Sequence, residues 1–205
     1  MHVAFFTRYS VRSLAEDSVS LTALGLPDQR CATYRPRVAP ARFVTDASLD
    51  YVARRLRFLG YDVVTVRGAR LEELYELGRR DARVVLTLST RHPKRFADVA
   101  HIVVPRDDAA SAVHGIARSH EAATAPFSRC PACNVALERR HPVEARGEVP
   151  GRVLRQGGAL TYCPSCGKWY WEGSHVDRIR AWLERAIGRP LEQPEPHDPP
   201  PSASG

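Results

Sequence analysis

The sequence predicts an α/β fold with a mostly parallel sheet, followed by a small metal-stabilised domain. Short apolar segments alternate with amphipathic ones over residues 42–119, as in parallel strands connected by helices. Four of the five cysteines form two CxxC pairs. The segment SHVDRIRAWLERAIG, 174–188, repeats apolar residues at helical spacing and predicts a closing helix.

Each element of the α/β part follows from its residue pattern. RVVLTL and HIVVP are almost entirely apolar, as expected of parallel strands buried on both faces. The segment at 48–60 places its apolar residues on one helical face and stops at Gly60. Strands are expected at 42–46, 61–66, 83–88 and 101–105, and helices at 48–60, 71–80, 92–99 and 107–119.

Composition divides the chain into four parts. Residues 1–40 show no clear pattern and form an N-terminal extension that includes the lone Cys31. The α/β domain is expected over 41–122, and a zinc ribbon with the closing helix over 127–188. Residues 189–205 are rich in proline and are predicted to be disordered.

Bulk composition limits the class of protein. The chain has 205 residues, no apolar run near the ~20 residues of a membrane span, and no pattern of a signal peptide. We therefore predict a cytoplasmic protein without a membrane partner. The formal net charge of +7 favours an anionic partner such as RNA. An arginine-rich composition that follows from a GC-rich genome explains the charge equally well. The oligomeric state is not predicted.

The paired cysteines predict a structural zinc site. Each CxxC unit makes a tight turn that directs two sulfurs at one ion, and two such turns complete a tetrahedral site without an open position. The site should stabilise the fold rather than catalyse a reaction. Its expected ligands are Cys130, Cys133, Cys163 and Cys166.

Acidic residues follow several of the predicted strands. The carboxyl ends of parallel strands meet at one edge of a sheet, where sites usually form. Carboxylates gathered there could hold Mg²⁺ or Mn²⁺ for phosphodiester chemistry, although acids at these places are also common as helix caps or solvated side chains. The residues concerned are Asp46, Glu72, Glu73, Asp107 and Asp108, with Ser89 after the third strand.

Several segments together resemble a known family. RFVTDASLDYVARRLRFLGYDVV, LEEL, RVVLTLS, the two CxxC pairs and KWYWEGSHVDRI occur in this order. The region 41–185 resembles the Mut-seven C-terminal RNase domain family. The resemblance implies a PIN-like α/β/α sandwich with an appended zinc ribbon and a metal-dependent ribonuclease activity.

The resemblance also implies roles for individual residues. Asp46 matches the principal metal ligand, Glu73 or Glu72 the acid of the second helix, and Asp107 and Asp108 the acids after the fourth strand. Ser89 stands where the family has an acid, and a serine hydroxyl is a poor metal ligand. Retained cleavage, RNA binding without cleavage, and a protein-interaction module therefore remain alternatives.

Basic and aromatic residues supply candidate RNA contacts. Arg54 and Arg57 share one face of the first helix and Arg91, Lys94 and Arg95 follow the third strand, where they could contact phosphates or only be solvated. The run Trp169–Trp171 is expected to dock the ribbon onto the α/β domain, with base stacking as the alternative.

Overall fold

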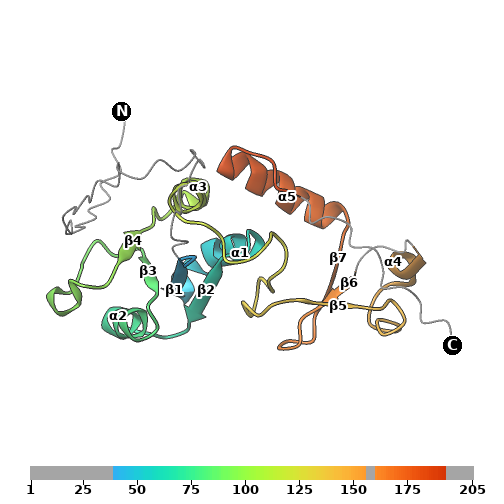
Figure 1. The fold of residues 1–205 in the computed structure, drawn as a ribbon, viewed down its shortest axis with the longest axis horizontal. Helices are drawn as coiled ribbons and strands as arrows, with labels where there is room; N and C mark the ends of the chain where they lie inside the picture. Colours follow the sequence, from blue (N-terminus) through green and yellow to red (C-terminus); the bar gives the residue numbers. More distant parts are fainter. Residues whose placement is uncertain (1–38, 156–159, 193–205) are drawn as a thin grey trace, which may run out of the picture. The chain divides into compact units, whose positions relative to one another are not determined.

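The computed structural model describes residues 39–155 and 160–192, and the elements of the α/β part follow the predicted order (Figure 1). Gly60 ends the first helix in a left-handed conformation, and a Cβ atom there would lie 1.9 Å from the Thr124 carbonyl oxygen. The predicted helix at 92–99 is a single 3-10 turn. The elements are β1 (Arg42–Asp46), η1 (Ala47–Leu49), α1 (Asp50–Phe58), β2 (Asp62–Val66), α2 (Leu71–Arg80), β3 (Val84–Thr87), η2 (Lys94–Phe96), β4 (His101–Val103) and α3 (Ala109–Ser119).

The four strands form a fully parallel sheet in the order β2-β1-β3-β4. The chain leaves β1 toward β2 on one side and returns to β3 on the other. The carboxyl ends of β1 and β3 therefore flank the topological switch point, where open α/β sheets usually bind ligands. Thr45 pairs with Leu86, so Asp46 and Thr87 are the next residues on these two strands.

Helices cover both faces of the sheet, as the sequence predicts (Figure 1). Phe43 points to the face covered by α1 and α3, while its neighbour Val44 points to the face covered by α2. This alternation along one strand creates two apolar cores. Leu74 and Tyr75 are the buried residues that α2 contributes to the second core.

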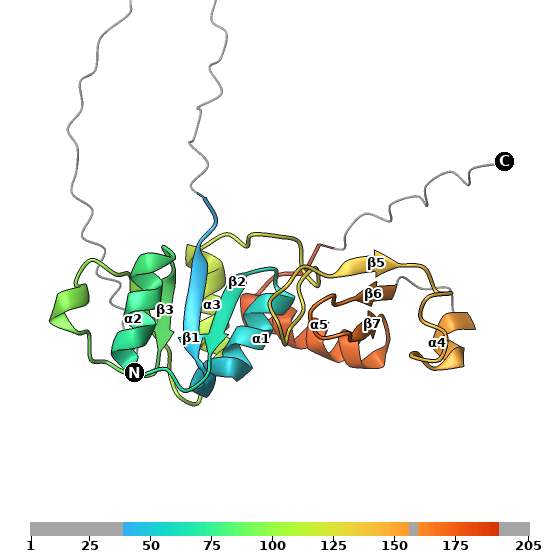
Figure 2. The ribbon, with the colours of Figure 1, turned by 90° about the horizontal axis from the view of Figure 1, so that it is seen from below.

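A second, antiparallel sheet follows (Figure 2). It consists of β5 (Glu138–Arg140), β6 (Leu160–Tyr162) and β7 (Trp169–Trp171), with the short helix α4 (Gly151–Arg155) between β5 and β6. The structure thus confirms a mostly parallel α/β fold followed by a small unit that is compatible with a zinc ribbon. None of the described helices is long and apolar enough to cross a membrane. The cytoplasmic location stays a prediction.

The closing helix α5 (Ser174–Ile187) belongs to the core of the α/β part. Leu183 and Ile187 pack in the same apolar core as α1 and α3. Leu191 is also buried there, so the predicted disordered tail cannot begin at residue 189. The division into domains at 41–122 and 127–188 stays a prediction. The N-terminal extension with Cys31, and the tail from 193 on, lie outside the described residues.

The aromatic run Trp169–Trp171 does not dock the ribbon onto the α/β part, so that expectation is wrong. Successive side chains of a strand point to opposite faces. Trp169 and Trp171 therefore share one face and pack on a small core of the ribbon itself, while Tyr170 points to the cysteines. Other residues make the contacts to the α/β part, as described below.

Candidate functional site

The carboxyl edge of the parallel sheet holds most of the predicted acidic residues. Asp46 ends β1, Glu73 lies in the first turn of α2, and Ser89 follows β3 by two residues. Asp107 and Asp108 lie between β4 and α3. All four strands run in the same direction, so these residues share one edge of the sheet.

Asp46 caps the short helix that follows β1. Its Oδ1 accepts from the backbone N–H of Ser48 at 2.7 Å and from the Ser48 hydroxyl. Oδ2 has no hydrogen-bond partner among the described residues. The side chain is half-buried at the switch point, so one carboxylate oxygen remains available as a ligand.

Asp107 and Asp108 differ in what their carboxylates do. Asp108 is the N-cap of α3, and its two oxygens accept from the backbone N–H and the hydroxyl of Ser111 at 2.8 and 2.5 Å. These bonds lower the pKa of Asp108, because they stabilise the ionised form. Asp107 is exposed and has no such partner in the described part of the chain. The Tyr51 hydroxyl donates to the Arg106 carbonyl at 2.8 Å and anchors this loop to α1.

Ser89, at the position of the missing acid, is used in a turn. Its backbone N–H donates to the Thr87 hydroxyl at 3.0 Å, and its own hydroxyl accepts from the Arg91 N–H at 3.1 Å. The Thr87 side chain is buried. These two bonds fix the turn that follows β3, and the chain then runs beside the start of α2, where Arg91 and Arg95 line a pocket.

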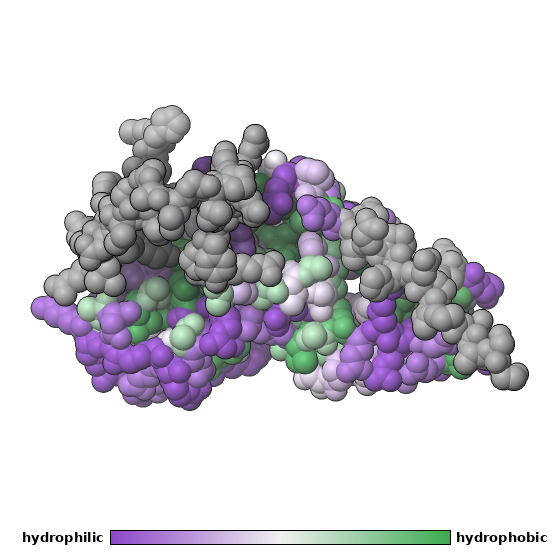
Figure 3. Space-filling model, in the orientation of Figure 1, coloured by the Kyte–Doolittle hydropathy of each residue, from purple (hydrophilic) through white to green (hydrophobic). Residues whose placement is uncertain are grey.

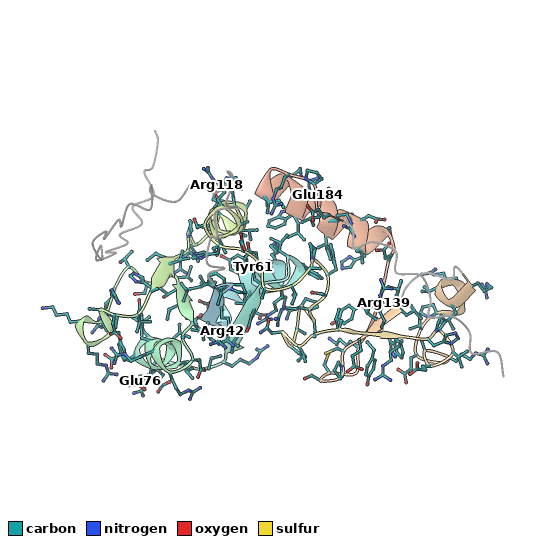
Figure 4. All side chains as sticks on the ribbon, viewed as in Figure 1. Arg42, Tyr61, Glu76, Arg118, Arg139 and Glu184 are labelled. Atoms are coloured by element: carbon teal, nitrogen blue, oxygen red, sulfur yellow. The ribbon has the colours of Figure 1, made fainter. Side chains whose placement is uncertain are left out.

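Glu73 lines an open pocket of ≈ 590 Å³ beside the start of α2. Its Oε2 accepts from the backbone N–H of Arg70 at 2.9 Å, which caps the helix. Glu72, Arg91 and Arg95 line the same pocket, so four predicted site residues meet there. The sequence analysis missed Arg70 and Glu76, because neither lies at a strand end. The surface around α2 is hydrophilic in Figure 3, and Figure 4 labels Glu76 on this helix.

The acidic residues do not form a preassembled metal site. Within 39–155 and 160–192, the four cysteines are the only group of three or more His, Cys, Asp or Glu side chains whose ligand atoms converge. Capping explains the difference, because Asp46, Glu73 and Asp108 each turn an oxygen toward the helix start that they cap. What remains fits an ion held by one or two carboxylates, waters and a substrate phosphate, which is common for Mg²⁺.

The basic residues near this edge are not equivalent. Arg95 is paired with Glu72 and Glu76, both at 2.9 Å, so most of its charge is compensated locally. Arg91 and Lys94 are exposed, and no ion pair of either is found among the described residues. These two are therefore the more accessible cations for a phosphate.

The predicted RNA contact of Arg57 is wrong. Arg57 is 1% exposed. Its guanidinium donates to the carbonyl oxygens of Val63 at 2.9 Å and Pro131 at 2.7 Å, and to the Thr65 hydroxyl at 2.6 Å. Burial lowers the pKa of Arg57, and the nearby Asp50 counters this effect. A side chain so enclosed cannot reach an external phosphate.

Arg54 is exposed on the same helix. It forms an ion pair with Asp50 at 2.8 Å, one helical turn away. Its predicted RNA contact stays a prediction.

The four predicted zinc ligands lie together. Their sulfur atoms are all within 4.8 Å of one another, and those of Cys130 and Cys166 are 3.9 Å apart. A tetrahedral Zn²⁺ with Zn–S bonds of ~2.3 Å requires sulfurs ~3.8 Å apart. The sulfur positions therefore fit a Cys₄ metal site, and Zn²⁺ is the ion that such a set usually holds.

The two CxxC units have the same local geometry. In the first, Cys130 accepts from the Asn134 N–H at 2.9 Å, and its N–H donates to the Val135 carbonyl at 2.8 Å. In the second, the bonds from Gly167 to Cys163 and from Cys163 to Lys168 repeat this pattern, both at 2.9 Å. The residue after each second cysteine has positive φ, 67° at Asn134 and 68° at Gly167. We refer to these turns as the first and the second knuckle.

The thiols of this cluster influence one another. Burial opposes ionisation of Cys130, but hydrogen bonds from the Tyr170 hydroxyl at 3.2 Å and from backbone N–H groups lower its pKa to about 7. Burial and neighbouring thiols raise the pKa of Cys133 to about 12 and also raise that of Cys163. Ionisation of Cys130 is thus favoured, whereas ionisation of Cys133 and Cys163 is opposed. A divalent cation among them removes this conflict, because it stabilises all four thiolates.

A match to a family profile shows the family to which the chain belongs. The profile described as Mut7-C RNAse domain matches residues 41–183, which include the parallel sheet, the carboxyl edge and all four cysteines. The chain belongs to the Mut7-C RNAse domain family. No curated protein and no solved structure gave a significant match. Membership in the Mut7-C RNAse family suggests a ribonuclease-type function and an interaction with RNA.

Proposed function

We propose that this chain is a ribonuclease that hydrolyses RNA phosphodiester bonds at the carboxyl edge of the parallel sheet, with Mg²⁺ or Mn²⁺ as cofactor. The supporting observation is the position of Asp46, which ends β1 at the switch point of a Mut7-C RNAse domain and keeps one carboxylate oxygen available. The Cys₄ cluster would hold Zn²⁺ with all four positions filled by sulfur, which leaves no open position for a substrate, so its role in this proposal is structural.

The acidic residues take different parts in the proposed site. Asp46 is the main ligand. Glu73 and Asp107 assist, each from an exposed position at the same edge. Asp108 is excluded as a ligand because both of its oxygens cap α3. A divalent cation, when bound there, supplies an activated water and compensates the charge that develops on the phosphate.

The neighbouring basic residues bind and orient the RNA backbone. Arg91 and Lys94 are exposed on the segment that follows the Ser89 turn after β3. Arg91 lines the pocket that also contains Glu73, so a phosphate held by Arg91 lies beside an acidic ligand. Arg95 mainly organises the pocket wall through its two glutamates.

The test is cleavage of labelled single-stranded and double-stranded RNA with Mn²⁺ or Mg²⁺. The wild-type protein should cleave, and Asp46→Asn should abolish cleavage while retaining the bond from Ser48 through the amide oxygen. Asp177→Asn, at the exposed start of α5, is the matched control and should cleave as the wild type does. Equal cleavage by the wild type and Asp46→Asn would contradict the proposal.

A second candidate function is RNA binding without cleavage. The observation that favours it is Ser89, a poor metal ligand whose hydroxyl is already used by Arg91. If the wild type binds RNA but does not cleave it, Ser89→Asp separates the two cases. Metal-dependent cleavage by this variant indicates a nuclease that lost one ligand. RNA binding without cleavage by Ser89→Asp supports a binding protein.

A further inference from the structure

One face of the ribbon sheet carries a row of aromatic side chains that is only partly covered. Leu160 and Trp171 pair across β6 and β7, and so do Tyr162 and Trp169. Residues two apart on a strand share a face, so all four side chains lie on the same side. The Leu160 end is buried in the small core that includes Ala145, whereas at the other end Trp169 packs against this core and Tyr162 does not, and both remain partly exposed.

The uncovered end forms a cavity of ≈ 510 Å³. Its floor is the pair Tyr162 and Trp169, whose ring centroids are 5.0 Å apart at an interplanar angle of 54°. Both side chains are half-exposed. Gly167 of the second knuckle forms one side, and the absence of a side chain there keeps the Tyr162 ring accessible. Arg140, Glu144 and Glu148 form the remaining wall.

The charged wall disfavours a free anion in the cavity. Arg140 is held by Glu138 at 2.5 Å and by Glu144 at 3.1 Å, and its guanidinium lies 5.4 Å from the centre of the Tyr162 ring. Its charge is therefore compensated. Glu148 is exposed and adds a carboxylate. A phosphate would meet more acidic than basic groups here, whereas a neutral ring with N–H donors would meet aromatic faces and acceptors.

The rim beside the floor is basic. Lys168 is exposed between Gly167 and Trp169, and it has no ion-pair partner among the residues that the structure describes. Arg139, labelled in Figure 4, lies on β5 next to Arg140. Because successive residues of a strand point to opposite faces, Arg139 is not part of this rim. An exposed aromatic face on Trp169, carboxylate acceptors on the wall and a cation on the rim match the base ring, its amino group and the phosphate of a nucleotide.

We propose that this cavity binds one unpaired base of single-stranded RNA, stacked on Trp169 and with its edge toward Tyr162. Glu144 or Glu148 accepts from the exocyclic amino group of the base, and Lys168 contacts the adjacent phosphate. The inference rests on the proposed function only in taking RNA as the partner, and it does not require cleavage. The site lies on the ribbon and uses none of the acidic residues at the carboxyl edge.

The experiment measures binding of a fluorescein-labelled single-stranded RNA of mixed sequence by anisotropy. The protein is the full, zinc-loaded chain with Asp46→Asn, so that cleavage cannot interfere. Trp169→Phe and Trp169→Leu form a matched pair, since both keep an apolar side chain but only Phe keeps a ring. Zinc content and circular dichroism verify that each variant is folded.

The proposal expects Trp169→Leu to weaken binding by about tenfold or more, and Trp169→Phe to stay within about threefold of the parent. Lys168→Ala should lower the salt dependence of binding by about one charge, while Trp169→Leu should leave it unchanged. Equal affinities of the Leu and Phe variants would overturn the proposal. Binding of a fully paired RNA duplex with the same affinity as the single strand would also overturn it. A duplex has no free base, so equal affinity would indicate electrostatic binding alone.

A second measurement does not depend on variants. Trp169, Trp171 and Trp182 each give an indole N–H signal in a ¹⁵N-correlated NMR spectrum. Adding a short oligoadenylate should shift the Trp169 signal and leave that of Trp182, on α5, in place. No shift at Trp169 under saturating oligoadenylate overturns the proposal. Absence of cleavage in the separate nuclease assay affects the proposed function but not this result.

Discussion

Asn134 of the first knuckle hydrogen-bonds Asp62 on the edge strand β2. Its Nδ2 donates to Asp62 Oδ1 at 2.7 Å, and its Oδ1 accepts from the backbone N–H of Val63 at 3.1 Å. On the same residue, the Val63 carbonyl accepts from the buried Arg57. The backbone N–H and C=O of Val63, which β2 would otherwise leave unpaired at the sheet edge, are thus satisfied beside the cysteine cluster. The knuckle thus protects part of an edge strand and also supplies two cysteines of a cluster that could hold a metal.

Replacing Asn134 should therefore weaken the whole fold. Asn134→Gly keeps the left-handed conformation but removes both side-chain bonds. It should lower the free energy of unfolding of the zinc-loaded protein by about 1–3 kcal/mol, measured by urea denaturation. Gly167→Asn is the control, because asparagine tolerates the same conformation in the second knuckle, which makes no hydrogen bond to the parallel sheet within the described part of the chain. Equal losses in both variants would show that knuckle geometry matters and the link to β2 does not.

The buried Arg57 should be more important for stability than the exposed Arg54. Arg57→Met leaves several carbonyl oxygens without a donor inside the protein and should cost about 2–4 kcal/mol. Arg54→Met removes only a surface ion pair with Asp50 and should cost less than about 1 kcal/mol. Thermal and urea unfolding of the two variants check this order. A reversed order would argue against Arg57 as the link between the helix and the first knuckle.

Metal removal should expose the edge of the sheet. Chelation frees the four sulfurs and loosens the first knuckle, so the bond from Val63 to Asn134 is lost or weakened. Hydrogen exchange, followed by mass spectrometry or NMR, should then show faster exchange of the Val63 amide. The amide of Val85, on the inner strand β3, should change much less, since it donates to the Ala100 carbonyl at 2.9 Å. Unchanged exchange at Val63 after complete chelation would contradict the coupling.

The repeating patterns of the sequence were enough to predict the fold class. The hydrophobic periodicity of strands and helices predicted the four parallel strands, and the spacing of the cysteines predicted the cysteine cluster, because both are local regularities of the sequence. Arg57 was misread because helical spacing places it on a face but does not reveal that residues from 131 on cover that face. The aromatic run was misread for a similar reason, since the partners of Trp169 and Trp171 lie within residues 145–154 and at Leu160 of the ribbon.

The candidate acidic site was predictable only in part. Parallel topology predicts that Asp46 and Asp107 share one edge of the sheet, and the structure agrees. The predicted topology could not reveal which carboxylate oxygens already cap a helix, because this depends on side-chain rotamers at each helix start. The same limit applies to Arg95, whose two glutamate partners lie on α2, some twenty residues earlier.

A histidine pair should make stability depend on pH. The rings of His92 and His101 are 4.2 Å apart between centroids, and Tyr75 lies beside both. Burial, and secondarily His92, lowers the pKa of His101. The folded state therefore binds this proton less readily than the unfolded state, whose pKa is about 6.5, so stability should fall as the pH drops below about 6.5.

Substitution of the titrating ring tests this effect. His101→Phe keeps an aromatic ring but cannot bind a proton, so its melting temperature should fall less than that of the wild type between pH 7.5 and 5.5. Saturating zinc in both samples keeps metal release equal. His141→Phe, at an exposed position of the ribbon, is the control and should retain the dependence of the wild type. Parallel curves for wild type and His101→Phe would assign the pH dependence to other groups.

The adjacent acids Asp107 and Asp108 should separate stability from catalysis. Asp108 caps α3 with both carboxylate oxygens, so Asp108→Ala should lower the free energy of unfolding by about 1 kcal/mol. It should leave the Mn²⁺ concentration for half-maximal cleavage unchanged. Asp107→Asn should leave stability within about 0.5 kcal/mol and raise that concentration, because it removes an assisting ligand. Urea denaturation and metal titration of cleavage, on the same two proteins, measure both quantities. If Asp108→Ala instead changed the metal requirement, its carboxylate would have to leave the helix cap during the reaction, and the assignment of the two acids would be reversed.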